Sequence, residues 1–494
     1  MMHKTIISIF LLHCMAHISI AYKVAIFVPD ISGSQILFNV RVAETLVANG
    51  HNVTLIRLDS LATKKVEPKI SPLIEQWRVK AYPDDNDYAA MRAHHSTIIF
   101  TATSFFSNDV TKALRLFVSS FITACEIIVQ NKELMSQLKE AKFDIAFTHF
   151  YDYCPIGLIY HAKIPTWIWL NGAQLMDVIA YLVGVPSPPS YVPLLLSDMS
   201  DKMSFMQRVK NFLGRSLMHP LAMRSIIDPE TEIFRRYLDP GMPHLSELAS
   251  QCPLVMVNSD ELYSLARPTL HKLVYIGGLG MNSRNVKPLE GEFKKIVDRS
   301  KHIVVMSFGS IANVTLMPAS WKDSLIGAFR RFPEIEFIMR YPARDLDHKL
   351  PSNVHISNWI PQVDLLQNEK TLAFISHCGF NSIQETIYSG VPIIAVPLFG
   401  DQFVNGRLAE RRRIGIVVPK NEFTQKRITN AIEEILNNPE YKNNVQRLLA
   451  MIRAKPVRPD EQLVKRLIRN CYQAHRETST IAQDVNKQIT IVNK

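Results

Sequence analysis

Residues 359–402 constrain the fold of this chain more than any other segment. An apolar run at 373–376 ends at His377, and a helical pattern begins at Asn381. A glycine closes that helix, and a second apolar run follows at 391–398. Strand, tight turn, helix, glycine stop and strand are typical of a βαβ unit in a parallel sheet. The segment therefore predicts an α/β protein.

The turn between the first strand and the helix has the composition of an anion site. Gly379 lets the backbone approach a ligand closely. Asn381 and Ser382 are expected at N-cap positions of the helix, whose free N–H groups attract anions. His377 adds a ring N–H at the same place. These groups predict a site that holds a diphosphate without a metal.

Residues on either side of this turn suit the other parts of a nucleotide sugar. Trp359 offers a flat face on which a uracil can stack, and Gln362 adds an amide one turn later. Glu385 can accept both hydroxyls of a ribose, because a carboxylate has several lone pairs. Asp401 and Gln402 follow the second strand and supply acceptors and donors for sugar hydroxyls.

This set of residues resembles the donor-binding signature of the UDP-glycosyltransferase superfamily, which includes the animal UDP-glucuronosyl- and UDP-glucosyltransferases. The resemblance covers the whole of residues 359–402. It implies two facing Rossmann-like domains of the GT-B type, with the UDP-sugar on the C-terminal domain and a small lipophilic acceptor on the N-terminal one. It also implies that Ser310, after a strand expected at 301–308, contacts the donor phosphate. No cofactor or metal is expected beyond the UDP-sugar co-substrate.

The length of the chain fits this two-domain arrangement. Its 494 residues exceed what one hydrophobic core usually supports, and 47% of them are hydrophobic, which excludes a disordered protein. We predict an N-terminal domain over 22–274, a linker over 275–296 and a C-terminal domain over 297–456. Residues 457–494 are expected to return to the first domain as a helix and then to end in a loose tail.

The catalytic residues of the resembled family are altered in this chain. The turn after the first predicted strand lacks the glycine-rich dinucleotide fingerprint, which argues against a dehydrogenase. In the family this turn carries a histidine that deprotonates the acceptor, and an acidic residue at a later strand end orients it. Gln35 and His149 occupy these two positions here, and Asp152 matches a further family position. Because glutamine cannot accept a proton at neutral pH, the sequence predicts an unusual catalytic group.

Two functions of different classes remain open. The first is an inverting glycosyltransferase that moves glucuronate or glucose from a UDP-sugar to a lipophilic acceptor. In that enzyme either His149 takes over as the base or an amine acceptor needs none. The second is a catalytically impaired lumenal protein that binds UDP-sugars or lipophiles. The complete set of donor residues favours the enzyme.

Several other segments carry weaker expectations. The net charge of +11 does not indicate a nucleic-acid partner, because the basic residues are scattered apart from those at 411–413. Acidic residues at 84–87 predict a solvated loop rather than a metal site. Residues 114–138 are expected to form a long helix over the acceptor cleft, and the proline-rich residues 178–196 an apolar loop. An amphipathic helix at 205–217 either covers the cleft, which we favour, or touches a membrane.

The N-terminal segment and the cysteines provide information about the cellular compartment in which the chain folds. Residues 1–21 have the pattern of a cleavable signal peptide, so the mature chain is expected in the endoplasmic reticulum lumen or outside the cell. No spanning helix is expected after Leu398, since no apolar run of ~20 residues follows it. The five cysteines left after cleavage define no disulfide framework, and Cys154 and Cys378 are interpreted as packing residues. Asn313 is the preferred glycosylation acceptor.

Overall fold

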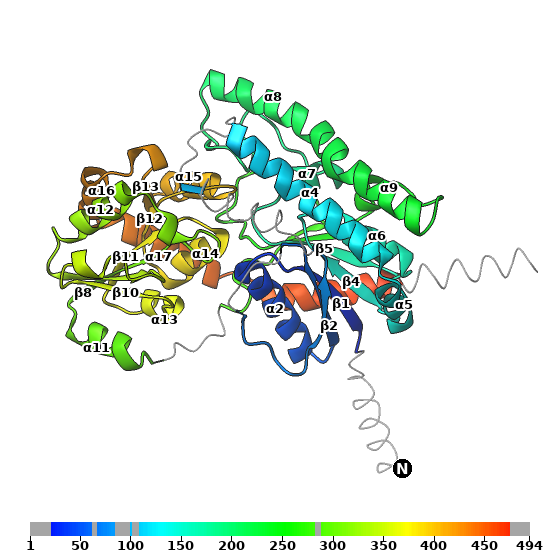
Figure 1. Ribbon diagram of the computed structural model, residues 1–494, viewed down its shortest axis with the longest axis horizontal. Coiled ribbons are helices and arrows are strands. Elements are labelled where there is room, and N and C mark those ends of the chain that lie inside the picture. The colour runs from blue at the N-terminus through cyan, green and yellow to red at the C-terminus, as the bar shows by residue number, and fades with distance from the viewer. Residues whose placement is uncertain (1–20, 62–66, 84–98, 101–107, 282–287, 475–494) are drawn as a thin grey trace, which may run out of the picture.

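The computed structural model of this chain describes residues 21–61, 67–83, 99–100, 108–281 and 288–474 (Figure 1). Nearly all of the predicted signal peptide and the acidic residues 84–87 lie outside this set.

The first half of the chain builds a parallel sheet of seven strands. Their order is β3-β2-β1-β4-β5-β6-β7, and every neighbouring pair is parallel. The inner strands are buried on both faces, which explains why they form continuous apolar runs in the sequence. The strands are β1 (Lys23–Pro29), β2 (Asn52–Asp59), β3 (Glu75–Lys80), β4 (Ile145–Thr148), β5 (Trp167–Asn171), β6 (Leu254–Val257) and β7 (Leu273–Tyr275).

Helices cover both faces of this sheet. They are α2 (Gly33–Ala48), α4 (Asn108–Gln130), α5 (Lys132–Ala141), α6 (Cys154–His161), α7 (Asp177–Leu182), α8 (Phe205–Ala222), a π-helical turn (Met223–Ile227), α9 (Asp228–Tyr237) and α10 (Leu245–Ser250). The helix predicted at 114–138 is in fact two helices, because Asn131 accepts the N–H of Leu134 and so begins α5. The loop predicted at 178–196 begins instead with α7, since its first proline, Pro186, lies beyond that helix.

The second half builds a parallel sheet of six strands in the order β10-β9-β8-β11-β12-β13. Its strands are β8 (His302–Ser307), β9 (Ile335–Arg340), β10 (Val354–Ser357), β11 (Thr371–Ser376), β12 (Ile393–Ala395) and β13 (Gly415–Val417). Its α-helices are α11 (Gly291–Arg299), α12 (Ala319–Phe329), α13 (Gln362–Leu366), α14 (Phe380–Ser389), α15 (Gln402–Arg411), α16 (Gln425–Asn437) and α17 (Glu440–Arg453). Two Rossmann-like domains are thus confirmed.

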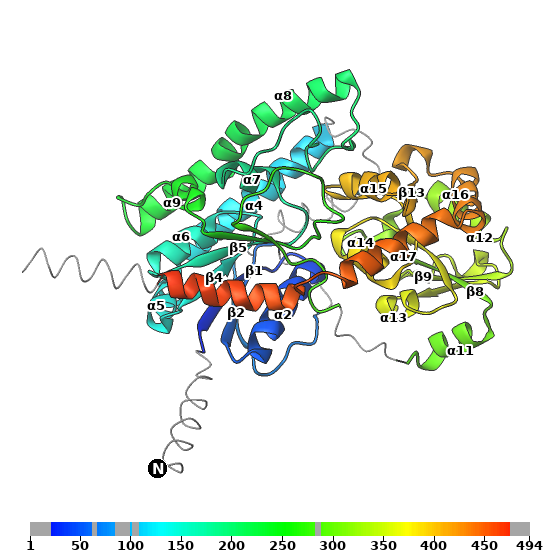
Figure 2. The same cartoon turned by 180° about the vertical axis from the view of Figure 1, so that it is seen from behind.

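The two domains lie side by side, and the C-terminal helix returns from the second domain and lies along the first (Figure 2). That helix, at 459–474, places Leu463, Leu467 and Cys471 in the same core cluster as strands of the first sheet. The segment predicted as a linker starts within β7 and ends within α11. Each domain therefore keeps its own sheet, while the chain passes between them twice.

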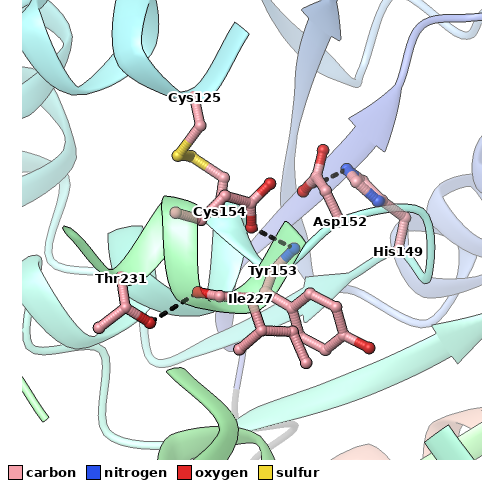
Figure 3. The surroundings of a disulfide bond; sticks show 8 residues. Cys125, His149, Asp152, Tyr153, Cys154, Ile227 and Thr231 are labelled. Carbon is pink, nitrogen blue, oxygen red and sulfur yellow. Dashed lines mark hydrogen bonds and ion pairs between the residues drawn. A yellow bond between two sulfur atoms is a disulfide. The ribbon is translucent and has the colours of Figure 1, made fainter. Parts of the chain in front are cut away.

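A disulfide bond joins Cys125 of α4 to Cys154 at the start of α6 (Figure 3). The prediction that Cys154 is only a packing residue is therefore wrong. Its partner lies 29 residues away on a separate helix, so the spacing does not mark the pair. Cys378 is free and buried, as expected of a packing residue.

Among the described residues one stretch, Thr111–Gln130 of α4, is long and apolar enough to cross a membrane. Phe121, Cys125 and Ile128 of that stretch belong to a core cluster of the first domain. We therefore interpret α4 as a helix of this domain.

Candidate active site

The turn between β11 and α14 brings several backbone N–H groups to one point. The helix starts at Phe380 with Gly379 as its N-cap, and no side chain caps its first N–H groups. The expectation that Asn381 and Ser382 are N-cap residues is wrong, because the chain becomes helical one residue earlier. Both lie in the first turn, where backbone N–H groups attract an anion.

The backbone of this turn is strained just before the helix. Cys378 has a φ angle of 64°, in the left-handed region that residues other than glycine rarely adopt. Its N–H donates to Ser376 Oγ at 3.2 Å, and its side chain is fully buried. Such conformations persist where the surroundings enforce them and concentrate at functional sites.

The ring of His377 is enclosed by two glycines. A Cβ atom on Gly309 would lie 2.6 Å from His377 Nε2, and one on Gly379 would lie 2.7 Å from it. Burial lowers the pKa of His377 to about 4, so the ring is neutral at pH 7. His377 Nδ1 and Asn381 Oδ1 are buried without a hydrogen-bond partner among the described residues. Unsatisfied polar atoms at one turn indicate the place of a polar ligand.

Arg340, at the end of β9, contributes a cation that the sequence indicated only weakly. It donates from Nη1 to the carbonyl of Gly309, and its guanidinium lies 5.6 Å from the centre of the Trp359 ring. Its Nε atom has no partner within the described part of the chain. Strands β8 and β9 are neighbours, so their carboxyl ends bring Arg340 beside the exposed Ser310. A positive charge here adds to the anion site.

The residues predicted to bind uridine lie together. Trp359 exposes 57% of its surface and so leaves a ring face open for stacking. Gln362 of α13 donates from Nε2 to Glu385 Oε2 of α14 at 2.6 Å. The amide and the carboxylate expected to contact the nucleoside are therefore adjacent.

Asp401 and Gln402, the residues predicted to bind sugar hydroxyls, lie at the start of α15 and have different hydrogen-bond partners. Gln402 is buried, and its Oε1 accepts the N–H groups of Leu398 and Phe399 at 2.9 and 3.1 Å. Its carbonyl therefore holds the preceding loop, and only its amide is left for a sugar hydroxyl. Burial raises the pKa of Asp401 to about 6, opposed by a hydrogen bond from Asn405.

Asn405 is a residue of this site that the sequence reasoning missed. Its Nδ2 donates to the carbonyl of Cys378 at 3.0 Å and to Asp401 Oδ2 at 2.9 Å. Its Oδ1 accepts from Gln174 Nε2 of the first domain at 2.7 Å. The position of Asn405 one helical turn after Asp401 was the only signal in the sequence. This side chain therefore connects the turn before α14, the carboxylate of Asp401 and the first domain.

The altered catalytic positions lie at neighbouring strand ends of the first domain. Gln35 is in the first turn of α2, and a Cβ atom on Gly172 would lie 2.9 Å from its Oε1. His149 follows β4, which pairs with β1. The carbonyl of Ser34 accepts a hydrogen bond from Asn381 Nδ2 at 3.2 Å. The first domain therefore directly contacts the turn before α14.

The surroundings of His149 argue against its role as the base. The side chain is buried, and its Nδ1 accepts the N–H of Tyr151 at 3.3 Å. Its Nε2 lies 4.0 Å from Asp152 Oδ1. Burial lowers the pKa of His149 to about 3. Both nitrogens thus face partners within the protein, and the ring binds protons weakly at neutral pH.

Asp152 has the proton affinity that His149 lacks. Burial raises its pKa to about 7, opposed by a hydrogen bond from the N–H of Cys154. Glu230 of α9 accepts the N–H of Tyr153, the residue that follows Asp152, at 2.9 Å. Burial and the charge of Asp152 both raise the pKa of Glu230. Because neighbouring carboxylates disfavour each other's ionisation, this pair takes up a proton more readily than an isolated carboxylate does.

Comparison with known proteins identifies the family. The family model described as UDP-glucoronosyl and UDP-glucosyl transferase matches residues 24–465. The chain belongs to this family. The Caenorhabditis elegans protein ugt-48, named as a candidate UDP-glucuronosyltransferase, is 31% identical over 91% of this transferase and 86% of its own length. UDP-glucuronosyltransferase 1A4 of Oryctolagus cuniculus is 32% identical over 71% of this chain and 65% of its own.

Solved structures show the same fold. The crystal structure of UDP-glucose:anthocyanidin 3-O-glucosyltransferase in complex with UDP has a TM-score of 0.60 and 15% identity, covering 92% of this transferase and all of that chain. The glycotransferase of kitacinnamycin has a TM-score of 0.61 and 17% identity, covering 91% and 99% of the two chains. The GT-B arrangement is thereby confirmed, and the protein is a UDP-glycosyltransferase by family. Within the described residues, no group of three His, Cys, Asp or Glu side chains is placed to hold a metal.

UDP binding should depend on the α14 turn. His377→Ala removes a polar ring from the diphosphate site, and Trp359→Ala removes a stacking surface worth ~1–3 kcal/mol, or roughly 5–150-fold in affinity. We expect weaker UDP binding by both variants in calorimetry, with unchanged thermal unfolding. Tyr472→Ala, which removes an aromatic side chain of 56% exposure elsewhere, is the control. Unchanged UDP affinity in both site variants would contradict the assignment.

Proposed function

We propose that this transferase moves glucose or glucuronate from a UDP-sugar to a small lipophilic acceptor, with inversion at the anomeric carbon. The observation that carries this proposal is the α14 turn. Its N–H groups are uncapped, the ring of His377 lies against Gly309 and Gly379 through Nε2, and the guanidinium of Arg340 donates to the carbonyl of Gly309. Donors fixed in place before the reaction stabilise the charge that develops on a leaving diphosphate.

The reaction needs three events at this interface. The acceptor atom attacks the anomeric carbon opposite UDP and forms the new glycosidic bond. The bond between that carbon and the diphosphate oxygen breaks, and its electron pair leaves with UDP. The acceptor's proton passes to Asp152, whose raised pKa suits base work near neutral pH. His149 Nε2 lies beside this carboxylate at 4.0 Å, which is beyond hydrogen-bond distance. Positioning by the two domains supplies much of the remaining acceleration.

The compartment proposed for this reaction is the lumen of the secretory pathway. The Cys125–Cys154 bond supports it, because disulfides persist in oxidising compartments and are rare in the cytosol. The signal-peptide pattern of residues 1–21 points in the same direction.

One observation favours a second function, the binding of UDP-sugars without turnover. Gln35 cannot accept a proton, and burial leaves His149 neutral with a pKa of about 3. If Asp152 is also inactive and the acceptor is not an amine, the donor site would bind its ligand without transfer.

The deciding experiment measures UDP release and glycoside formation by the purified full chain. UDP-glucose and UDP-glucuronate are each tested with a panel of phenols and a panel of aromatic amines, in the presence of a chelator. We expect transfer from at least one donor, and the same rate with and without the chelator. A chain that binds UDP but forms no glycoside with either panel would establish the binding function instead.

A further inference from the structure

Helix α8 is attached to the first domain by polar side chains. Asn211 is its only buried residue. Asn211 Oδ1 accepts the N–H of Leu194 at 2.9 Å, and Nδ2 donates to the carbonyls of Pro189 and Val192 at 2.7 and 2.8 Å. Arg215 donates to Asp177 Oδ1 at 3.0 Å. The face that packs on the protein is therefore the hydrophilic one.

The opposite face of α8 is apolar and exposed. Side chains three or four residues apart along a helix lie on the same face, and a broad apolar face also includes some adjacent pairs. The large apolar residues of this face, each exposing more than half of its surface, are Phe205, Met206, Phe212, Leu213, Leu217 and Leu221. A helix in a water-soluble protein normally buries such a stripe, so a continuous exposed one marks an interaction surface.

The charge beside this apolar face is entirely positive. The helix sequence FMQRVKNFLGRSLMHPLA contains no Asp or Glu. Arg208 and Lys210 are exposed on it, and Lys202 and Arg224 are exposed at its two ends. The acidic residues of the preceding loop are already paired across the domain interface, Asp198 with Arg407 and Asp201 with Arg411. An occupant of this surface should therefore be apolar and negatively charged.

The shape of the surface favours a flat partner. In both views α8 forms the outer edge of the first domain, and no helix or strand of the described residues lies outside it (Figures 1 and 2). Its 18 residues form a straight ridge roughly 27 Å long. A helix that projects in this way can contact a flat surface along its whole length.

We propose that α8 docks this protein on an anionic lipid surface, with its apolar face at the boundary between headgroups and acyl chains and its cations beside the headgroups. Helices of this composition lie in the plane of the interface. The proposal does not depend on the proposed function. If that function also holds, docking keeps the acceptor-binding domain next to the phase in which lipophilic acceptors concentrate.

The test is flotation of the full chain with vesicles of phosphatidylcholine, with or without phosphatidylserine. We expect the wild type to float with the anionic vesicles, and Phe212→Ser/Leu213→Ser/Leu217→Ser to bind them at least ~10-fold more weakly. Arg208→Glu/Lys210→Glu should lose the preference for phosphatidylserine. The matched control is Leu73→Ser/Leu270→Ser, two exposed leucines elsewhere on the first domain. All variants should keep wild-type UDP affinity and thermal unfolding, and all carry the same N-terminus.

Two results would overturn the proposal. The first is equal flotation of the wild type and the triple-serine variant. The second is a concentration-dependent dimer, measured by light scattering, that the triple-serine substitution dissociates without changing vesicle binding. That second outcome would assign the face to another copy of this chain.

Discussion

Replacing Asp152 with asparagine is expected to lower the rate of transfer to phenols about 10²–10⁴-fold, the usual contribution of a general base. Asparagine keeps the size of the side chain but cannot take the proton. Transfer to amines should fall much less, because an amine attacks through its neutral lone pair and loses its proton afterwards. UDP affinity should not change, since Asp152 lies on the acceptor domain.

The pH dependence of the rate distinguishes a catalytic role of Asp152 as a base from a purely structural role of its carboxylate. A base works only when ionised, and burial raises the pKa of Asp152 to about 7. For the wild type, kcat/KM with phenols should therefore rise as pH increases through about 7 and then level off. Asp152→Asn should lose this rise. Gln35→His, which adds an imidazole at a neighbouring strand end, should restore part of the rate. Equal losses with phenols and amines, or an unchanged profile, would exclude Asp152 as the base.

Removal of the disulfide should have the largest effect on stability. A bond that closes a loop across a sequence separation of 29 residues restricts the unfolded chain. Its loss is expected to lower the free energy of unfolding by about 3–4 kcal/mol. Urea denaturation of Cys125→Ser/Cys154→Ser measures this difference.

Reductant supplies the internal control for this prediction. The wild type should become as unstable as the double variant when reduced, whereas the double variant should not respond. Cys252→Ser changes a buried free cysteine and should leave the response to reductant intact. A wild type that is equally stable with and without reductant would contradict the structural role of the bond.

The relative positions of the predicted donor-site residues could be worked out because these residues lie in one stretch of sequence. A βαβ unit fixes the positions of its strand, turn and helix, so His377, Gly379 and Glu385 could be placed from periodicity and turn chemistry alone. The error at Asn381 and Ser382 was one of helix boundary, since the helix starts at Phe380. The apolar runs of the parallel strands likewise indicated both sheets.

Features that depend on contacts between distant segments could not be predicted. The lowered pKa of His149 and the raised pKa of Asp152 both arise from burial, which depends on how distant segments pack together. The partner of Cys154 lies on α4. The face that α8 turns toward the protein is set by Asn211 bonding to the loop at 189–194, although its amphipathic pattern was plain. Periodicity shows that a helix has two faces, but not which one is covered.

The hydrogen bonds of Asn405 connect the proposed donor site to the contact between the two domains. Separating the domains would break its bond from Gln174 and the bond from Tyr263 Oη to its carbonyl at 3.0 Å. The same side chain holds Asp401 and the carbonyl of Cys378. A ligand that orders these groups would therefore also favour the arrangement in which Asn405 contacts both domains. By thermodynamic reciprocity, anything that favours this arrangement would raise the affinity for that ligand by the same factor.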